Sequence, residues 1–242
     1  MKREYHKWYC QGLERDMELL VFGHAGAKVL AFPTRCGRFY DYENMGMVGA
    51  LAHQLQQGWV QLICVDSIDQ ESFYCNWCNP RDRIIRHLKY EAYILNEVLP
   101  FSQTINSNPF LTSLGCSFGA YHATNIAFRH PNRFNRLVAM SGRYDLTSAP
   151  DGFRDLFDGY YDNDVYFNMP NHYMTNMGEN GILSDIRRLD IKLVIGEYDP
   201  FLDDNKRLSD QLWSKGVWHL FKVWNGRAHG YRRWKEMIGW FV

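Results

Sequence analysis

Ser117 is the residue of this sequence best placed to act as a nucleophile. Gly115 precedes it by two positions and Gly119 follows it by two, which gives the pattern Gly-x-Ser-x-Gly of a nucleophile elbow. The apolar run that begins at Leu111 predicts a strand, a tight turn at Ser117 and then a helix. Residues without a Cβ on both sides relieve the crowding of such a turn. The helix would direct free N–H groups at the space above Ser117, which suits a developing oxyanion.

A serine hydroxyl requires a general base, and the base requires an acid that orients it. After an elbow serine the expected chain order is Ser, then Asp or Glu, then His. His229 fits the base best, because it lies in a loop of small residues, 225–230, directly after the last predicted strand. The remaining histidines after Ser117 are expected on the elbow helix, at a helix end, inside a strand and in an irregular segment: His122, His130, His219 and His172, respectively. Of these, His172 is the alternative base.

Asp199 is the first choice for the orienting acid. It follows a clean apolar strand, 192–196, and Pro200 stops that strand directly after it. Asp145, which follows the strand ending at Ser141, is the second choice, and Glu197 competes. The remaining carboxylates of this region precede a predicted helix and suit N-cap positions: Asp203 and Asp204.

An oxyanion hole needs two backbone N–H donors. The residue after the nucleophile, Phe118, is expected to supply one. The loop after the third strand is expected to supply the other, with Arg35 as the choice and Thr34 or Cys36 as neighbours.

Alternating strands and helices position these residues. Apolar runs predict strands at 5–10, 17–22, 28–32, 60–65, 111 to the Ser117 turn, 135–141, 192–196 and 218–224. Amphipathic or bounded segments predict helices at 44–57, 80 to about 98, 118–129, 205–215 and 231–241. The fold class is therefore α/β, with a mainly parallel sheet, helices on both faces and an antiparallel N-terminal edge. Residues 143 to about 181 interrupt the alternation of strands and helices and predict an aromatic-rich, cap-like insertion within one domain, 1–242. The aromatic residues of this insertion either line the site or only pack the insertion against the rest of the protein.

Composition narrows the range of functions. The chain has 242 residues, 46% of them hydrophobic and 22% charged, with a formal net charge of zero. No basic run, membrane-length apolar run or export signal is visible, so neither nucleic acid nor a membrane is expected as a partner. The six cysteines are expected to be reduced thiols in a cytoplasmic protein. The Cys75-x-x-Cys78 pair lacks a second ligand pair, so its role stays open, and no metal or cofactor is predicted.

The sequence resembles the α/β-hydrolase superfamily, and more closely the putative-esterase family that includes S-formylglutathione hydrolase (esterase D), tributyrin-type esterases, feruloyl esterases and the mycolyltransferases. The resemblance covers nearly the whole chain and is carried by Gly115–Gly119, Arg129–Phe134 leading to Ala139–Gly142, Gly196–Asp199 with Asn205, and Ala228–Gly230 before Trp234. It implies an α/β-hydrolase fold and makes Asp199, three residues after a glycine, the acid of the triad. One segment departs from the family: its usual His-Gly after the third strand is replaced by Pro33-Thr34-Arg35-Cys36, and only the later Gly37 remains.

Three functions are compatible with these residues. The first is a serine carboxylester hydrolase that acts through Ser117, His229 and Asp199 on a small, aromatic or sugar-linked ester. The second is an acyltransferase with the same triad, because the acyl acceptor varies within the family. The third is a non-catalytic binding protein on a hydrolase scaffold. The expected partner is a small-molecule ester, and homo-oligomerisation is left open.

Overall fold

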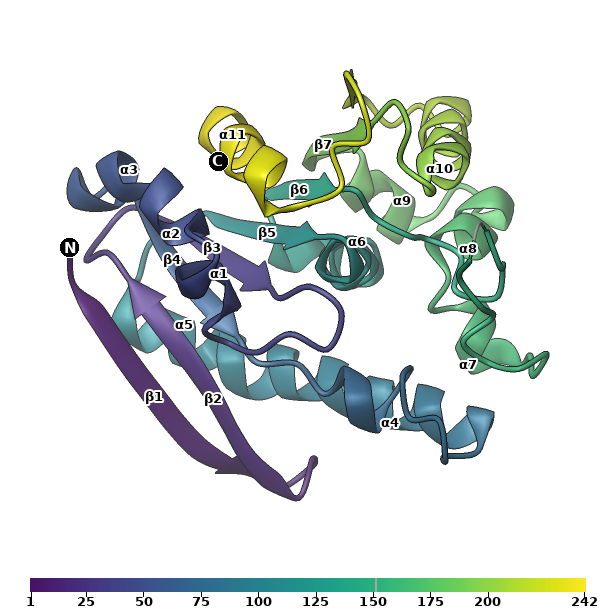
Figure 1. Ribbon diagram of the computed structural model, residues 1–242, viewed down its shortest axis with the longest axis horizontal. Coiled ribbons are helices and arrows are strands. Elements are labelled where there is room, and N and C mark those ends of the chain that lie inside the picture. The colour runs from purple at the N-terminus through teal and green to yellow at the C-terminus, as the bar shows by residue number, and fades with distance from the viewer. Residues whose placement is uncertain (151) are drawn as a thin grey trace.

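One eight-stranded sheet organises the part of the chain that the computed structural model describes, residues 1–150 and 152–242 (Figure 1). Its strands are β1 (Arg3–Cys10), β2 (Arg15–Phe22), β3 (Ala27–Phe32), β4 (Val60–Val65), β5 (Leu111–Cys116), β6 (Arg136–Met140), β7 (Asp190–Gly196) and β8 (His219–Trp224). Their order across the sheet is β1-β2-β4-β3-β5-β6-β7-β8. The β1–β2 and β2–β4 pairings are antiparallel and the others are parallel. The predicted mainly parallel sheet with an antiparallel N-terminal edge is confirmed.

Helices cover both faces of the sheet (Figure 1). They are α1 (Asp41–Asn44), α2 (Met47–Ala50), α3 (Ala52–Gln56), α4 (Pro80–Tyr93), α5 (Leu99–Ile105), α6 (Phe118–Arg129), α7 (Asn163–Tyr166), α8 (Pro170–Asn176), α9 (Gly181–Ile186), α10 (Leu202–Ser214) and α11 (Tyr231–Phe241). One buried cluster holds side chains of α2, α3 and α11, and another holds side chains of α4, α6, α9 and α10. In the described residues, no helix has the combination of length and apolar character that crossing a membrane requires.

The strand order explains which helices share a face. The chain moves from β3 to β4 in one direction across the sheet, and from β4 to β5 and onward in the other. Right-handed connections in opposite directions place their helices on opposite faces. Side chains of β3 alternate accordingly: Val29 and Ala31 belong to one buried cluster, and Leu30 and Phe32 belong to the other. The carboxyl ends of β3 and β5 therefore lie side by side where the direction reverses, which is where open α/β sheets bind ligands.

Two predicted helices differ from the observed ones. The single helix expected at 44–57 is wrong, because Gly46 adopts a left-handed conformation with φ +77° and separates α1 from α2. The helix that begins at Pro80 runs further than predicted, through a π-helical turn at Ile94–Val98 into α5. Pro100 has no N–H to donate within this helix, and the wider turn lies directly before it.

Glu91 joins α4 to the end of α6. Its carboxylate accepts hydrogen bonds from Arg129, with Nε to Oε2 at 2.9 Å, and lies 3.1 Å from Nε2 of His130. Burial alone would raise the pKa of Glu91, but the hydrogen bond from His130 and the charge and hydrogen bonds of Arg129 outweigh burial and lower this pKa to about 2. The ionised form is therefore favoured in the folded state.

We expect Glu91→Gln to lower the free energy of unfolding by about 3 kcal/mol at pH 7. Because the pKa of Glu91 is depressed on folding, its stabilisation is fully present above the ordinary value of 4.5 and is lost as the pH falls toward 2. Urea titrations of both proteins at pH 7 and pH 3 measure this difference. It should shrink by more than half at pH 3, and an unchanged difference would contradict the assignment.

Candidate active site

Ser117 occupies the turn between β5 and α6. Its backbone has φ +54° and ψ −121°, a conformation that side-chain-bearing residues rarely adopt. Its N–H donates to the Met140 carbonyl at 2.8 Å, which ties the turn to the end of β6. The strained turn places the hydroxyl in a cleft at the carboxyl edge of the sheet rather than in the core. The strand, turn and helix predicted from the sequence are confirmed.

The two flanking glycines are required by close backbone contacts. A Cβ on Gly115 would lie 2.0 Å from the Gly119 carbonyl oxygen. A Cβ on Gly119 would lie 2.3 Å from the carbonyl oxygen of Phe32, the last residue of β3. Both distances are far inside van der Waals contact, so the elbow can pack against β3 only if these positions lack side chains.

His229 and Asp199 lie in line with the Ser117 hydroxyl. Ser117 Oγ is 3.0 Å from Nε2 of His229, and Nδ1 of His229 is 2.8 Å from Oδ2 of Asp199. Asp199 follows β7, its carboxylate is fully buried, and its Oδ1 accepts the Phe201 N–H at 3.0 Å. The His229 ring lies between the rings of Phe201 and Trp234, with centroids 5.8 and 5.2 Å away. The structure thus brings together the three residues that the sequence analysis put first.

The alternative base and the alternative acid pair with each other. Nε2 of His172 lies 3.2 Å from Oδ2 of Asp145, while Glu197 is exposed. The remaining histidines after Ser117 also contact other side chains: His122 contacts Asp69, His130 contacts Glu91 and His219 contacts Ser209. The N-cap prediction for Asp203 and Asp204 is wrong, because both lie inside the first turn of α10, after its N-cap Phe201.

The loop after β3 faces the elbow and is held by a buried carboxylate. Oδ2 of Asp69 accepts the Cys36 N–H at 2.8 Å, and Oδ1 lies 2.9 Å from Nε2 of His122. Cys36 itself adopts φ +55°. Because its N–H is occupied, Cys36 is the weakest of the three oxyanion candidates in this loop. The N–H groups of Phe118 and Arg35 form no hydrogen bond with the described residues, so their assignment as oxyanion donors stays a prediction.

Asp69 was not predicted as a site residue, although it lies in a polar loop directly after β4. The structure makes it a positioning residue, since it links the elbow helix to the loop that would carry the second oxyanion donor. The loop is also tied to the last helix, because Thr34 Oγ1 lies 3.1 Å from the Tyr231 hydroxyl. These contacts fix the position of the loop in which Pro33-Thr34-Arg35-Cys36 stands where the family usually has His-Gly.

A cleft of about 390 Å³ opens over Ser117 and His229. In the described part of the chain its walls are mainly aromatic, with two arginines and no acidic residue: Thr34, Arg35, Tyr74, Ser117, Phe118, Arg143, Phe153, Phe201, His229, Gly230, Tyr231 and Trp234. Arg143 and Tyr74 were not predicted as site residues. Arg143 comes shortly after β6, at the same edge of the sheet as the triad, and that position was the available signal.

The predicted insertion, 143–181, contributes Arg143 and Phe153 to this cleft. Of its aromatic residues Phe153 lines the cleft, whereas Phe157 and Tyr173 are buried in other clusters. Tyr161 and Phe167 are each 52% exposed. Its Asp151 lies outside the described residues. Most of the described aromatic residues of the insertion therefore pack it against the rest of the protein or face solvent. Among them, Phe153 alone lines the site.

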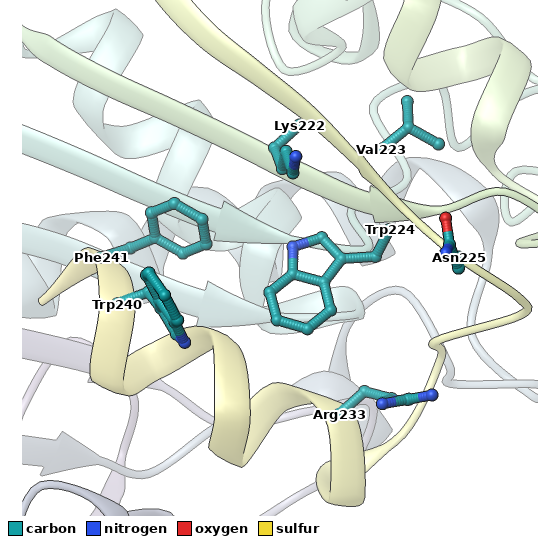
Figure 2. Close-up of a pocket in the computed structure, with 7 residues that line it drawn as sticks. All are labelled: Lys222, Val223, Trp224, Asn225, Arg233, Trp240 and Phe241. Carbon is teal, nitrogen blue, oxygen red and sulfur yellow. The ribbon is translucent and has the colours of Figure 1, made fainter.

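A larger cavity, of about 630 Å³, lies between β8 and α11. Figure 2 shows rings toward one end, from Trp224, Trp240 and Phe241, and Arg233 and Asn225 toward the other. Lys222 and Val223 of β8 complete its lining. None of these residues belongs to the Ser117–His229–Asp199 set, so the larger cavity does not coincide with the predicted site.

The cysteines differ in part from expectation. Cys75 and Cys78 form a disulfide with their Cα atoms 5.3 Å apart, so the expectation of six reduced thiols is wrong for this pair. The two residues lie in a tight turn that brings their Cα atoms within bridging distance. The other four are free, and burial raises the pKa of the Cys116 thiol, next to Ser117, to about 12. In residues 1–150 and 152–242, no three His, Cys, Asp or Glu side chains gather as metal ligands.

Comparisons with known proteins identify a sequence family and a shared fold. The sequence model of the family described as "Putative esterase" matches residues 39–237. Similar solved structures include a ferulic acid esterase, with 17% identity, a TM-score of 0.76, and coverage of 99% of this chain and 95% of that one. A second is FphF, a fluorophosphonate-binding serine hydrolase of Staphylococcus aureus, with 15% identity, a TM-score of 0.69, and coverage of 99% of this chain and 98% of that one. A third is an S-formylglutathione hydrolase of Agrobacterium tumefaciens, with 14% identity, a TM-score of 0.69, and coverage of 98% of this chain and 91% of that one. At these identities the structures show a shared α/β-hydrolase fold. No curated protein sequence matches the chain.

Proposed function

Because the chain belongs to the Putative esterase family and is a serine-type carboxylic-ester hydrolase, we propose that Ser117, His229 and Asp199 are its catalytic triad and that it acts through an acyl-enzyme. The observation that carries this proposal is the aligned pair of contacts, 3.0 Å from Ser117 Oγ to His229 Nε2 and 2.8 Å from His229 Nδ1 to Asp199 Oδ2. Such contacts let the imidazole accept the hydroxyl proton while the buried carboxylate fixes its tautomer.

The reaction proceeds in two halves. His229 Nε2 takes the proton of Ser117 Oγ as Oγ bonds to the ester carbonyl carbon, and the N–H groups of Phe118 and Arg35 bind the resulting oxyanion. The tetrahedral intermediate then breaks its bond to the alkoxy oxygen, which leaves as an alcohol with the proton from His229. In the second half, water gives its proton to His229 and attacks the acyl carbon. Collapse of that intermediate releases the carboxylic acid and returns the proton to Ser117.

The cleft supports hydrolysis of a small or aromatic ester. Its walls include the rings of Tyr74, Phe118 and Phe153, which suit flat or short groups. The His229 side chain is 18% exposed, so water can reach the base that must activate it. No observation favours acyl transfer to another alcohol over hydrolysis, and the aligned triad argues against a purely binding role.

Labelling with a fluorophosphonate probe tests the assignment of the nucleophile. The probe phosphonylates an activated serine, so we expect stoichiometric labelling of the wild type on the peptide that contains Ser117. Ser117→Ala should not be labelled. Ser113→Ala is a matched control at a buried serine of the same strand, and it should retain labelling. If Ser117→Ala were labelled as fast as the wild type, Ser117 would not be the nucleophile.

A further inference from the structure

Arg143 is a buried cation that lines the cleft over Ser117 and has no carboxylate partner within residues 1–150 and 152–242. Only 3% of the surface of Arg143 is exposed to solvent, and the residue lines the cleft. Its hydrogen bonds go to backbone carbonyls alone, from Nε to Asp145 and from Nη2 to Leu146, Ser148 and Arg154. Within the described part of the chain no acidic side chain forms an ion pair with it. A guanidinium in this position has been removed from water and still carries its full charge.

The acids nearest to Arg143 are engaged elsewhere. Asp145 pairs with His172, and both Asp204 and Asp155 accept backbone N–H groups. Burial lowers the pKa of Arg143, and Tyr74 together with these acids only partly offsets that effect. Isolated buried charge is unfavourable unless an opposite charge arrives. A substrate anion would provide that charge.

The backbone on both sides of Arg143 is fixed, so the guanidinium is held in place. Asn205 Nδ2 donates to the Gly142 carbonyl at 2.6 Å, and the Tyr144 N–H donates to the carboxylate of Asp204. Of the guanidinium nitrogens, Nε and Nη2 are used by the carbonyls, while Nη1 has no partner among the described residues. No hydrogen bond within residues 1–150 and 152–242 therefore competes with a ligand in the cleft for Nη1.

Arg35 is the second cation that lines the same cleft. It is exposed, its guanidinium lies 5.7 Å from the centre of the Tyr74 ring, and it forms no ion pair with the described residues. Among the described residues, none that lines the cleft is acidic. Asp199, the carboxylate that contacts His229, is fully buried. The described lining of the cleft therefore combines aromatic walls with two positive charges and no negative one.

We propose that the natural substrate is an ester that carries a carboxylate, which Arg143 and Arg35 bind while Ser117 attacks the ester carbonyl. This inference rests on the proposed function and specifies its substrate class. A bidentate or bridging contact to a carboxylate satisfies the free Nη1 donor and neutralises the buried charge. The aromatic rings of the cleft accommodate the uncharged remainder of the substrate.

Matched ester pairs test the proposal and locate the anion. The first pair places it on the acyl side: the 4-nitrophenyl monoester of glutaric acid against 4-nitrophenyl pentanoate. The second places it on the alcohol side: 4-acetoxybenzoate against its methyl ester. Each kcat/KM is divided by the hydroxide-catalysed rate of the same ester, which removes differences in intrinsic reactivity. We expect the charged member of at least one pair to be preferred by about 10- to 100-fold.

Three variants assign the preference to the arginines. Arg35→Gln, at an exposed side chain without hydrogen bonds, should reduce the charged-to-neutral ratio by about tenfold. Arg143→Lys should reduce it further, since an ammonium cannot serve the carbonyls and a carboxylate together. Arg133→Gln is the control, because it removes an exposed positive charge before the start of β6, whereas Arg143 follows the end of that strand. It should leave the charged-to-neutral ratio unchanged. If Arg143→Lys fails to fold, Arg35→Gln still decides the question.

The outcomes separate this proposal from the triad assignment. A wild-type ratio of one or less in both pairs would overturn the substrate class, and so would a ratio that Arg35→Gln leaves unchanged. Either result is compatible with loss of all hydrolysis in Ser117→Ala. If instead Ser117→Ala hydrolysed both members of a pair at the wild-type rate, the triad assignment itself would be wrong.

Discussion

His229→Ala is expected to lower kcat for hydrolysis of 4-nitrophenyl acetate by about 10⁶-fold. Without the imidazole, nothing accepts the proton of Ser117, and the hydroxyl stays a poor nucleophile at neutral pH. Ser117→Ala should cost about as much, because the two residues act as one unit. The double variant should therefore be no slower than either single variant. Steady-state kinetics of the three purified proteins, with circular dichroism to verify folding, measures all of these effects.

His172→Ala is the control for this prediction. His172 is bound to Asp145 and does not line the catalytic cleft, so its loss should change kcat by less than about threefold. Two results would contradict the triad. One is a His229→Ala variant that retains most of its activity. The other is a double variant whose defect equals the product of the single defects, which would mean that Ser117 and His229 act independently.

The arrangement of Ser117, His229 and Asp199 could be predicted from local sequence patterns, even though the three residues lie far apart in the sequence. Ser117 and His229 are 112 residues apart in sequence, and Asp199 and His229 are 30 apart. Each nevertheless follows its own parallel strand, and parallel strands end at one edge of a sheet. The order of the strands and the Gly-x-Ser-x-Gly spacing are therefore enough to predict that the three residues lie close together.

The supporting residues could not be predicted in the same way. Asp69 acts through His122, 53 residues later, and through the Cys36 N–H, 33 residues earlier, and no local pattern marks either contact. Arg143 becomes notable only when its lack of an ion-pair partner and its burial are known together. The helix errors have a related cause. Gly46 interrupts an apolar periodicity that otherwise continues. The π-helical turn at Ile94–Val98 leads into α5, so the helix continues past Pro100 although it was expected to end at about residue 98.

Asp199→Asn is expected to lower kcat by about 10⁴-fold with a small effect on KM. Asp199 Oδ2 accepts from Nδ1 of His229, which leaves Nε2 free to receive the Ser117 proton. An asparagine can present its NH₂ group to Nδ1 instead, and the ring then holds its proton on Nε2, facing the serine. In that tautomer His229 cannot act as a base, although the geometry of the site is retained.

Asp145→Asn is the matched variant, because Asp145 is also a buried aspartate paired with a histidine after a strand of the sheet. Its pKa is lowered by hydrogen bonds from His172 and Thr147, which outweigh the raising effect of burial. We therefore expect a loss of about 1–3 kcal/mol in the free energy of unfolding, with kcat within about threefold of the wild type. Parallel kinetic and urea measurements on the two variants distinguish the roles. A larger kcat defect in Asp145→Asn than in Asp199→Asn would move the catalytic acid from the end of β7 to the end of β6, and the 2.8 Å contact between His229 and Asp199 would then be structural only.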